Sequence, residues 1–316
     1  MTMPNASAAA TTPNGAGSSD SPLLGMTAAA AAFGLLSVMT LFAKLLSAHH
    51  HVIEIAFWRN IIAIVPFLAI IALGRRDILT IHSKPRVLLV RSVVGTLNIM
   101  FMFGAFSLLP LADATSLIFT SSLFVPVLGF LFLGEHVGPY RWTAIVIGII
   151  GVLWVAQPGG AEWNVLGVAL GLIAAFFNAV LGTMLRLLGR TERPETMTFY
   201  FLLIGAVMLL PVMPFIATMP THDEIGLLIG LGLSGSLMQF LLSTAFKYAP
   251  AALASVFNYT QIIWATLFGW AVFGDWPASN ILIGAAIIIT SSVIVILRER
   301  YLARKGRLPR PPVATA

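Results

Sequence analysis

Cysteine is absent from this sequence, and only 9% of its residues are charged. The first absence excludes disulfide bonds and thiolate metal sites. The second, together with 58% hydrophobic residues and a mean hydropathy of +0.94, is typical of a membrane protein, since soluble domains carry about a quarter charged residues. Polar and apolar residues do not alternate over many segments, so a membrane β-barrel is not expected.

Familiar enzyme motifs are missing as well. The sequence has no HExxH, no GxSxG and no phosphate-binding glycine loop with its lysine. The run His49-His50-His51 has no neighbouring carboxylate or thiol ligands, so we interpret it as a polar connector rather than a metal site. We expect a protein that is not an enzyme and uses no cofactor or metal. A lipid-modifying enzyme inside the membrane is the alternative class, although we do not find the clustered Asp or His residues that it would need at one membrane face. A channel is the third class, but the sequence lacks the rings of charge or the filter loop that a channel needs.

Hydrophobic runs of helix length fill most of the chain. A spanning helix needs about 20 apolar residues, and the runs are separated by short segments that carry Pro or Gly. The fold class is therefore all-α, a polytopic membrane protein with ten transmembrane helices. Prolines inside the spans, Pro66, Pro126 and Pro211, are expected to mark bends. The expected spans are 23–46, 52–73, 86–107, 110–133, 139–157, 164–187, 195–217, 223–246, 250–273 and 278–297.

One stretch of the chain occurs twice, at a constant offset of 140 residues. Residues 106–135 read FSLLPLADATSLIFTSSLFVPVLGFLFLGE, and residues 246–275 read FKYAPAALASVFNYTQIIWATLFGWAVFGD. Glu135 corresponds to Asp275. Such self-similarity between two apolar halves is typical of transporters built from repeats. The identical residues, without a gap, are Phe106, Pro110, Ala112, Ala114, Thr120, Gly129 and Gly134, which recur as Phe246, Pro250, Ala252, Ala254, Thr260, Gly269 and Gly274.

Basic residues gather in alternate connections, which the positive-inside rule assigns to the cytoplasm. Both termini are therefore expected to be cytoplasmic. The tight loops and the lack of a targeting leader suit a bacterial inner membrane. The basic tail is expected to lie beside anionic lipid and not to bind nucleic acid. Three of the 18 Lys and Arg residues, Lys44, Arg59 and Arg91, are not part of this pattern and lie in spans or at their edges. The other 15 are assigned to the inner connections, with the adjoining helix ends, and to the tail: Arg75, Arg76, Lys84, Arg86, Arg141, Arg186, Arg190, Arg193, Lys247, Arg298, Arg300, Arg304, Lys305, Arg307 and Arg310.

The domain organisation follows from this topology. Because each half has five helices, an odd number, the second half must insert upside down relative to the first, giving two inverted five-helix repeats. The first residues are small and polar and are expected to be disordered. The expected units are a cytoplasmic leader at 1–22, the first repeat at 23–158, the second repeat at 164–298 and a basic cytoplasmic tail at 299–316.

The repeated motifs carry a family resemblance. PLADAT at 110–115, PAALAS at 250–255 and the closures LGE and FGD, within ten paired spans, resemble the drug/metabolite transporter superfamily and its EamA-type branch most closely. The resemblance covers residues 23–298 and implies a secondary transporter working by alternating access. Similar proteins move amino acids, nucleosides, S-adenosylmethionine or riboflavin, inward or outward. Small multidrug-resistance relatives carry a glutamate in the first helix; residues 28–42 here are uncharged, so proton coupling by that route is not expected.

Polar and aromatic residues near the middle of the spans are the candidates for the substrate site. Polar groups in the bilayer are costly unless they are paired or face a cavity, although a single Ser or Thr also satisfies itself on its own helix. Flat rings among amides favour a planar, hydrogen-bonding ligand. Among the substrates that the family resemblance implies, riboflavin is therefore the expected one, with an amino acid or S-adenosylmethionine as alternatives. The candidates are Arg59, Asn98, Phe119, Thr120, Ser121, Asn178, Tyr200, Gln239, Asn258, Tyr259, Gln261 and Trp264.

The charges in the spans receive separate interpretations. Arg59 is expected to contact an anionic or carbonyl group of the substrate. The alternative is an ion pair with Glu54 or Asp113, although a helix separates Glu54 and Arg59 by about 140°. Lys44 and Arg91 lie near helix ends and are expected to reach the lipid headgroups.

Small residues recur at a spacing of four. Gly167 and Gly171, and again Gly226 and Gly230, are expected to let helices approach each other closely. A homodimer interface is the weaker interpretation of the same pattern.

Overall fold

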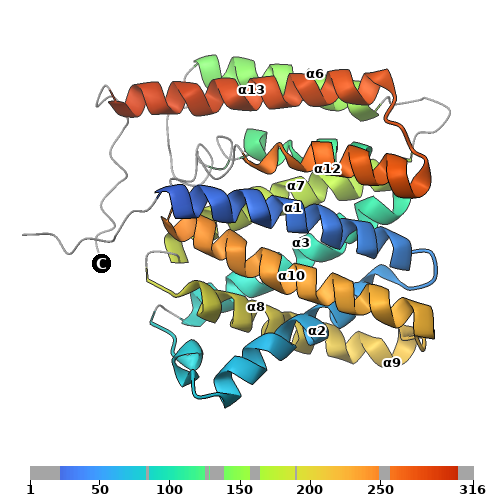
Figure 1. Cartoon of the computed structure of the whole chain (residues 1–316). Helices are drawn as coiled ribbons and strands as arrows, with labels where there is room; N and C mark the ends of the chain where they lie inside the picture. The colour runs from blue at the N-terminus through green and yellow to red at the C-terminus, as the bar shows by residue number, and fades with distance from the viewer. Residues whose placement is uncertain are drawn as a thin grey trace, which may run out of the picture.

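The computed structural model describes residues 22–82, 85–124, 128, 139–156, 164–188, 191–248 and 257–304 (Figure 1). The leader before Pro22, the Glu135 turn and the tail after Arg304 lie outside this range. The helices are α1 Pro22–Leu46, α2 Val52–Ala72, η1 Arg76–Leu79, α3 Pro85–Leu108, α4 Leu111–Ile118, α6 Pro139–Ala156, α7 Val165–Leu188, α8 Pro194–Leu209, η2 Leu210–Val212, α9 Met213–Ile216, α10 His222–Tyr248, α12 Gln261–Phe268, η3 Gly269–Phe273 and α13 Ser279–Arg304.

The helices confirm the expected all-α membrane fold, and the described residues contain no strand. Six helices or helical segments are long and apolar enough to cross a bilayer: residues 23–46, 52–72, 85–108, 165–185, 194–216 and 222–248. Four shorter apolar segments fall in the remaining expected spans, at Leu111–Phe124, Ile145–Val155, Gln261–Phe273 and Ser279–Ser291. At its C-terminal end α13 continues to Arg304, past the expected end at 297, because Arg and Glu are strong helix formers.

Two of the three span prolines can be followed. Pro66 lies inside α2, which continues through it from Val52 to Ala72. Pro211 lies in η2, where α8 changes to a 3-10 turn before the short helix α9. A proline lacks the backbone N–H that an α-helix interior needs, so the change of helix type at Pro211 has a direct cause. Pro126 lies outside the described residues.

The fourth and ninth expected spans are interrupted at matching positions. α4 ends at Ile118 and is followed by a turn at Phe119 and Thr120; α12 begins at Gln261 after a turn at Tyr259 and Thr260. In each turn the Thr hydroxyl donates to the carbonyl three residues earlier, at 2.7 Å. The Thr backbone N–H donates to that same carbonyl, at 3.1 Å in both turns. A side chain that bonds the backbone in this way competes with regular helix.

Helices of the first half of the chain pack mainly on helices of the second half. α1 packs along α10 and α3 along α7, so the first long helix of each half lies beside the third long helix of the other. α2 packs on α8, and α4 on α12. α6 and α13 form a separate pair at one edge of the bundle, seen at the top of Figure 1. This exchange is the arrangement expected of two structurally similar halves.

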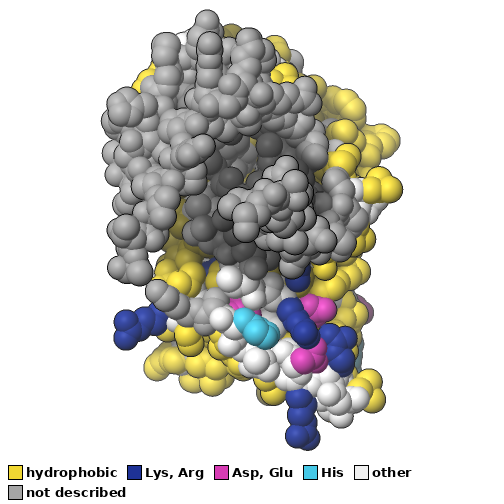
Figure 2. All heavy atoms as spheres, turned by 90° about the vertical axis from the view of Figure 1, so that its left-hand side faces the viewer, with side chains coloured by type: hydrophobic (Ala, Val, Ile, Leu, Met, Phe, Trp, Pro, Cys, Tyr) yellow, Lys and Arg dark blue, Asp and Glu magenta, His cyan; other side chains and the backbone are white. Residues whose placement is uncertain are grey.

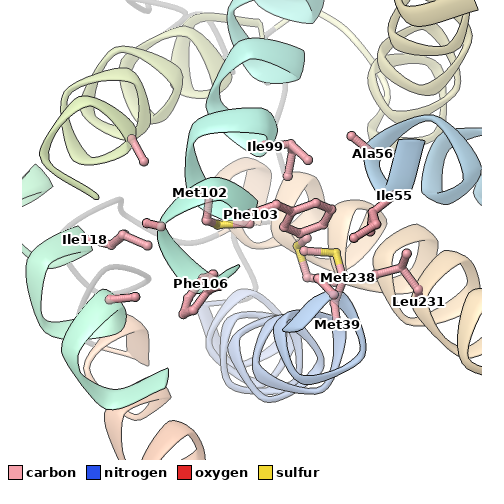
Figure 3. Packing of buried hydrophobic residues seen from close by; sticks show 14 of the residues in the cluster. Met39, Ile55, Ala56, Ile99, Met102, Phe103, Phe106, Ile118, Leu231 and Met238 are labelled. Carbon is pink, nitrogen blue, oxygen red and sulfur yellow. The ribbon is translucent and has the colours of Figure 1, made fainter. Parts of the chain in front are cut away.

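A central apolar core joins α1, α2, α3 and α10. Phe103 from α3 is 2% exposed and lies beside Met39 of α1, Ile55 of α2 and Met238 of α10 (Figure 3). Lipid tails are as apolar as these side chains, so helices in a bilayer associate through close van der Waals packing, and this core provides such packing between the two halves.

The expected helix-packing glycines act within the chain. A Cβ on Gly167 would lie 2.8 Å from Leu109, and one on Gly171 3.2 Å from Leu117. A Cβ on Gly230 would lie 2.7 Å from Phe42, whereas Gly226 has no atom within 4 Å. Three of the four glycines therefore serve contacts inside one molecule.

Candidate functional site

The two helix breaks bring equivalent residues of the repeat into contact. Phe119 and Tyr259, which are 140 positions apart, pack edge to face with ring centroids 5.4 Å apart. Phe119 is fully buried, and Tyr259 is half-buried. In transporters built from repeats, discontinuous helices form the substrate site near the bilayer midplane. This pair therefore marks the centre of the candidate site.

Amide and hydroxyl groups follow the breaks directly. Ser121 and Gln261, the next equivalent pair, are 8% and 1% exposed. The Oε1 atom of Gln261 is buried and accepts no hydrogen bond, and the same holds for Oδ1 of Asn98 in α3. Buried polar atoms are nearly always bonded, so these two acceptors indicate places where a ligand or an ordered water would donate.

Two further candidates lie close in sequence to the second break. Asn258 precedes Tyr259 and is half-buried. Trp264 stacks on Phe268 with ring centroids 6.1 Å apart and remains 42% exposed. Its indole Nε1 lies 3.9 Å from where a Cβ of Gly34 would stand, so this ring edge faces α1.

The other three uncharged candidates lie on other elements. Gln239 is 6% exposed, one turn after Gly235 in α10. Asn178 is half-buried in α7. Tyr200 donates its hydroxyl to the carbonyl of Leu79 in η1, at 2.9 Å, which places this hydroxyl at the end of the bundle.

That end carries a charged cluster, which Figure 2 views directly. Arg75 donates to Asp77 at 3.0 Å, and Arg193 from the other half also bonds Asp77. The hydrogen bond from Arg75 holds the pKa of Asp77 below its ordinary value. The carboxylate is therefore charged above the ordinary Asp pKa, and the contribution of this pairing disappears only as the pH falls through the lowered pKa.

Arg59 is buried completely, and its partners are neutral. Its Nη1 donates to Oδ1 of Asn60 at 2.9 Å, and Nη2 donates to the carbonyl of Gly235 at 3.2 Å. The guanidinium lies 5.2 Å from the ring centroid of Phe201. Glu54, one of the two acids considered as its partner, instead accepts from Thr218. Among the described residues neither Glu54 nor Asp113 forms an ion pair with Arg59.

Arg91 does not reach the headgroups, and that expectation was wrong. It is 2% exposed, its guanidinium lies 4.5 Å from the same Phe201 ring, and Nη1 donates to the carbonyl of Met197 at 3.5 Å. The position near the start of α3 predicted a path to the lipid surface, but α8 packs over this face and offers an aromatic ring. Lys44 is likewise held by protein, donating to the carbonyl of Leu109 at 2.7 Å.

The burial of two arginines on one ring has an energetic consequence. Transferring an ion into a protein interior costs several kcal/mol even after relaxation. A desolvated cation–π contact returns about 2 kcal/mol. Within the described residues no carboxylate lies within 4.0 Å of either guanidinium. The pair is therefore positively charged and only partly compensated.

The histidine run forms a second polar cluster, at the opposite end of α2 from η1. His50 is buried, with Nδ1 3.2 Å from Glu54 and Nε2 3.3 Å from Glu224. Thr218 donates its backbone N–H to Glu54 at 3.1 Å, and its hydroxyl lies 2.8 Å from His50 Nδ1. We call these four residues the His50 cluster. It joins α2 and the α1–α2 connection to the segment around α10. The expectation that the run has no neighbouring carboxylate was wrong, because folding brings Glu54 and Glu224 to His50.

The long apolar helices define a multi-pass helical membrane protein. Two matching helix breaks in contact, with buried polar side chains directly after them, are typical of the secondary-transporter class. A sequence model of the EamA-like transporter family matches residues 23–157 and again residues 165–297. The chain belongs to the EamA-like transporter family, within the drug/metabolite transporter superfamily.

Characterised relatives cover most of the chain. The riboflavin transporter of Rhizobium johnstonii is 30% identical over 292 residues, 89% of this chain and 93% of its own. The S-adenosylmethionine uptake transporter of Rickettsia bellii is 28% identical over 272 residues, 85% and 92% of the two chains. The pseudopaline exporter of Pseudomonas aeruginosa is 28% identical over 258 residues, 81% and 90%. The chain is accordingly a small-metabolite transporter.

A solved structure shares the fold. It is 19% identical, covers 89% of this chain and 98% of its own, and superimposes with a TM-score of 0.60. At this identity the likeness concerns the fold alone.

Proposed function

We propose that this chain carries a planar heterocyclic metabolite across a bacterial inner membrane by alternating access, moving it chemically unchanged, with riboflavin as the first candidate substrate. The observation that carries the proposal is the Phe119–Tyr259 ring contact at the two matching breaks, with the unbonded Gln261 oxygen two residues after Tyr259. The aromatic rings offer flat faces on which a planar ligand can stack, and a hydrogen bond to the amide would fix the orientation of that ligand. The riboflavin transporter among the relatives supports the choice.

S-adenosylmethionine is the second candidate, favoured by a separate observation. Its adenine is also planar, and its carboxylate would suit Arg59, which has only neutral partners. A relative named for S-adenosylmethionine uptake supports this alternative.

Orientation and assembly are part of the proposal. Both termini are proposed to be cytoplasmic because the basic connections and tail would then lie inside, beside anionic lipid. A homodimer is a further proposal, for which Gly226 offers one uncovered position.

We expect the chain to restore growth of cells that cannot make riboflavin on low external riboflavin. Gln261→Ala is expected to reduce uptake at least about tenfold, because about 1.4 kcal/mol of lost interaction changes affinity tenfold. The measurement is initial uptake of labelled riboflavin, normalised to the protein in the membrane. Asp223→Ala, an exposed change away from the breaks, is the matched control and should transport normally. Absence of uptake with protein present in the membrane would discard riboflavin import and turn the test to S-adenosylmethionine.

A further inference from the structure

The Phe201 ring contacts the buried guanidinium groups of Arg59 and Arg91, which come from different helices. Their charges lie 5.2 Å and 4.5 Å from the ring centroid. We propose that Arg59 and Arg91 form a subsite for a carboxylate, or another compact anionic group, of the transported metabolite. The inference rests on the proposed function, since the ligand is the substrate of the transporter.

The first argument is charge balance. The hydrogen-bond acceptors around the two groups are the Asn60 side-chain oxygen and the carbonyls of Gly235 and Met197, all of them neutral. The Nε atoms of both arginines are buried without a hydrogen-bond partner in the structure. Buried charges are normally paired, so the missing component is an anion that accepts from both side chains.

The second argument is depth in the membrane. Arg59 is seven residues after the start of α2, and Arg91 is six residues after the start of α3. These helices begin at opposite ends of the bundle, at the His50 cluster and after η1. With a rise of about 1.5 Å per residue, each arginine lies roughly 10 Å inside a hydrocarbon core of about 30 Å. The ring between them is therefore near the midplane, where transporters of this class bind substrate.

The third argument is that glycines make room for this arrangement. A Cβ on Gly95 of α3 would lie 2.7 Å from the Phe201 ring, and a Cβ on Gly235 of α10 would lie 2.7 Å from Nε of Arg59. The ring and the guanidinium thus rest directly on helix backbone. Phe201 and Gly235 belong to the second half and both arginines to the first. Relative movement of the halves would therefore uncover the charges.

Arginine chemistry specifies the ligand class. The planar fork of a guanidinium donates two parallel hydrogen bonds to a carboxylate or phosphate, which a neutral carbonyl satisfies less well. A purely structural role would be served at lower cost by uncharged side chains of similar size. Of the two candidate substrates only S-adenosylmethionine carries a carboxylate, so the subsite also distinguishes between them.

The test uses the purified full chain in detergent and the probe pair acetate and acetamide, which have nearly the same shape but differ in charge. At equal concentration and constant ionic strength, acetate is expected to raise the thermal unfolding midpoint by about 2 °C more than acetamide, because a ligand stabilises the state that it binds. Arg91→Gln is expected to abolish that difference. Arg86→Gln, an exposed change on the same helix, should keep it.

Arg91→Lys keeps a positive charge but lacks the planar guanidinium, and it is expected to retain less than half of the difference between the unfolding midpoints in acetate and acetamide. This variant tests the subsite if Arg91→Gln does not fold. Equal effects of acetate and acetamide on the unsubstituted chain, or an undiminished difference in the folded Arg91 variants, would overturn the subsite. Uptake of riboflavin and S-adenosylmethionine into liposomes by the same preparations separates the two proposals. Uptake without an acetate effect removes the subsite alone, and an acetate effect without uptake removes the proposed function alone.

Discussion

Gly232→Val is expected to destabilise the folded chain by about 3 kcal/mol, the upper part of the usual range for overpacking. A Cβ at this position would lie 2.5 Å from the Cβ of Ile62 and 3.3 Å from the backbone nitrogen of Ala63 in α2. Backbone cannot yield as a flexible side chain does, so α10 would be forced away from α2. The contact between α10 and α2 also contains the hydrogen bond from the Ser236 hydroxyl to the carbonyl of Ala63, at 2.9 Å, and this bond would be strained as well.

The measurement is the thermal unfolding midpoint of the purified protein in detergent. Gly226→Val is the matched control: it makes the same change in the same helix, at a position with no atom within 4 Å. We expect Gly226→Val to change the midpoint little. Equal midpoints for the two variants would show that the close approach of α10 to α2 is not needed for stability.

Glu54→Ala is expected to cost about 3 kcal/mol at the His50 cluster, because it removes one partner from a buried, hydrogen-bonded charge group. Glu54 is fully buried and accepts from the backbone and the hydroxyl of Thr218 while facing His50. Its loss would leave the Thr218 N–H without its acceptor and His50 Nδ1 without its neighbouring carboxylate, while Glu224 would remain at Nε2. We expect this end of the bundle to open more often.

Hydrogen exchange of the Thr218 region measures that opening, with faster exchange expected in Glu54→Ala. Glu54→Gln keeps an oxygen for Thr218 and removes the charge, so it should lie between the alanine variant and the unsubstituted chain. Asp223→Ala, an exposed acid at the same end, should leave exchange unchanged. Unchanged exchange in Glu54→Ala would contradict the view that this cluster holds the end closed.

The helices could be predicted because the information for them is local. Length and hydrophobicity decide whether a segment spans a bilayer, and the expected span at 223–246 corresponds to α10 at His222–Tyr248. The breaks were beyond such reasoning. The repeat paired Thr120 with Thr260, but whether a Thr hydroxyl bonds its own backbone and ends the helix depends on the local conformation.

The site could be predicted in part, and what was missed depended on distant partners. Phe119, Tyr259 and Gln261 were singled out as aromatic or amide residues inside spans, and the structure brings the two rings together. Arg91 was assigned to the headgroups because distance from the helix end was the only information available. The ring that holds it, Phe201, is in α8, and no sequence spacing indicates that contact.

The His50 cluster shows the same limit. His50 was expected to be a loop residue without special partners, yet Thr218 lies 168 positions away in the chain. The sequence position of Glu54, three residues after the histidine run, was the one available signal. The burial of His50 and Glu54, which makes their pairing favourable, became apparent only from the packing of the helices.

Side-dependent labelling of Ser121→Cys tests the central claim most directly, that substrate passes between the two matching helix breaks. The chain has no cysteine of its own, so a single introduced thiol is the only target for a membrane-impermeant maleimide. Ser121 is 8% exposed and follows the first break; Ser291→Cys in α13, where the residue is 0% exposed, is the control. We predict labelling at position 121 that the transported substrate slows, and none at position 291. A Ser121→Cys variant that transports normally but resists labelling from both sides of the membrane would contradict the account.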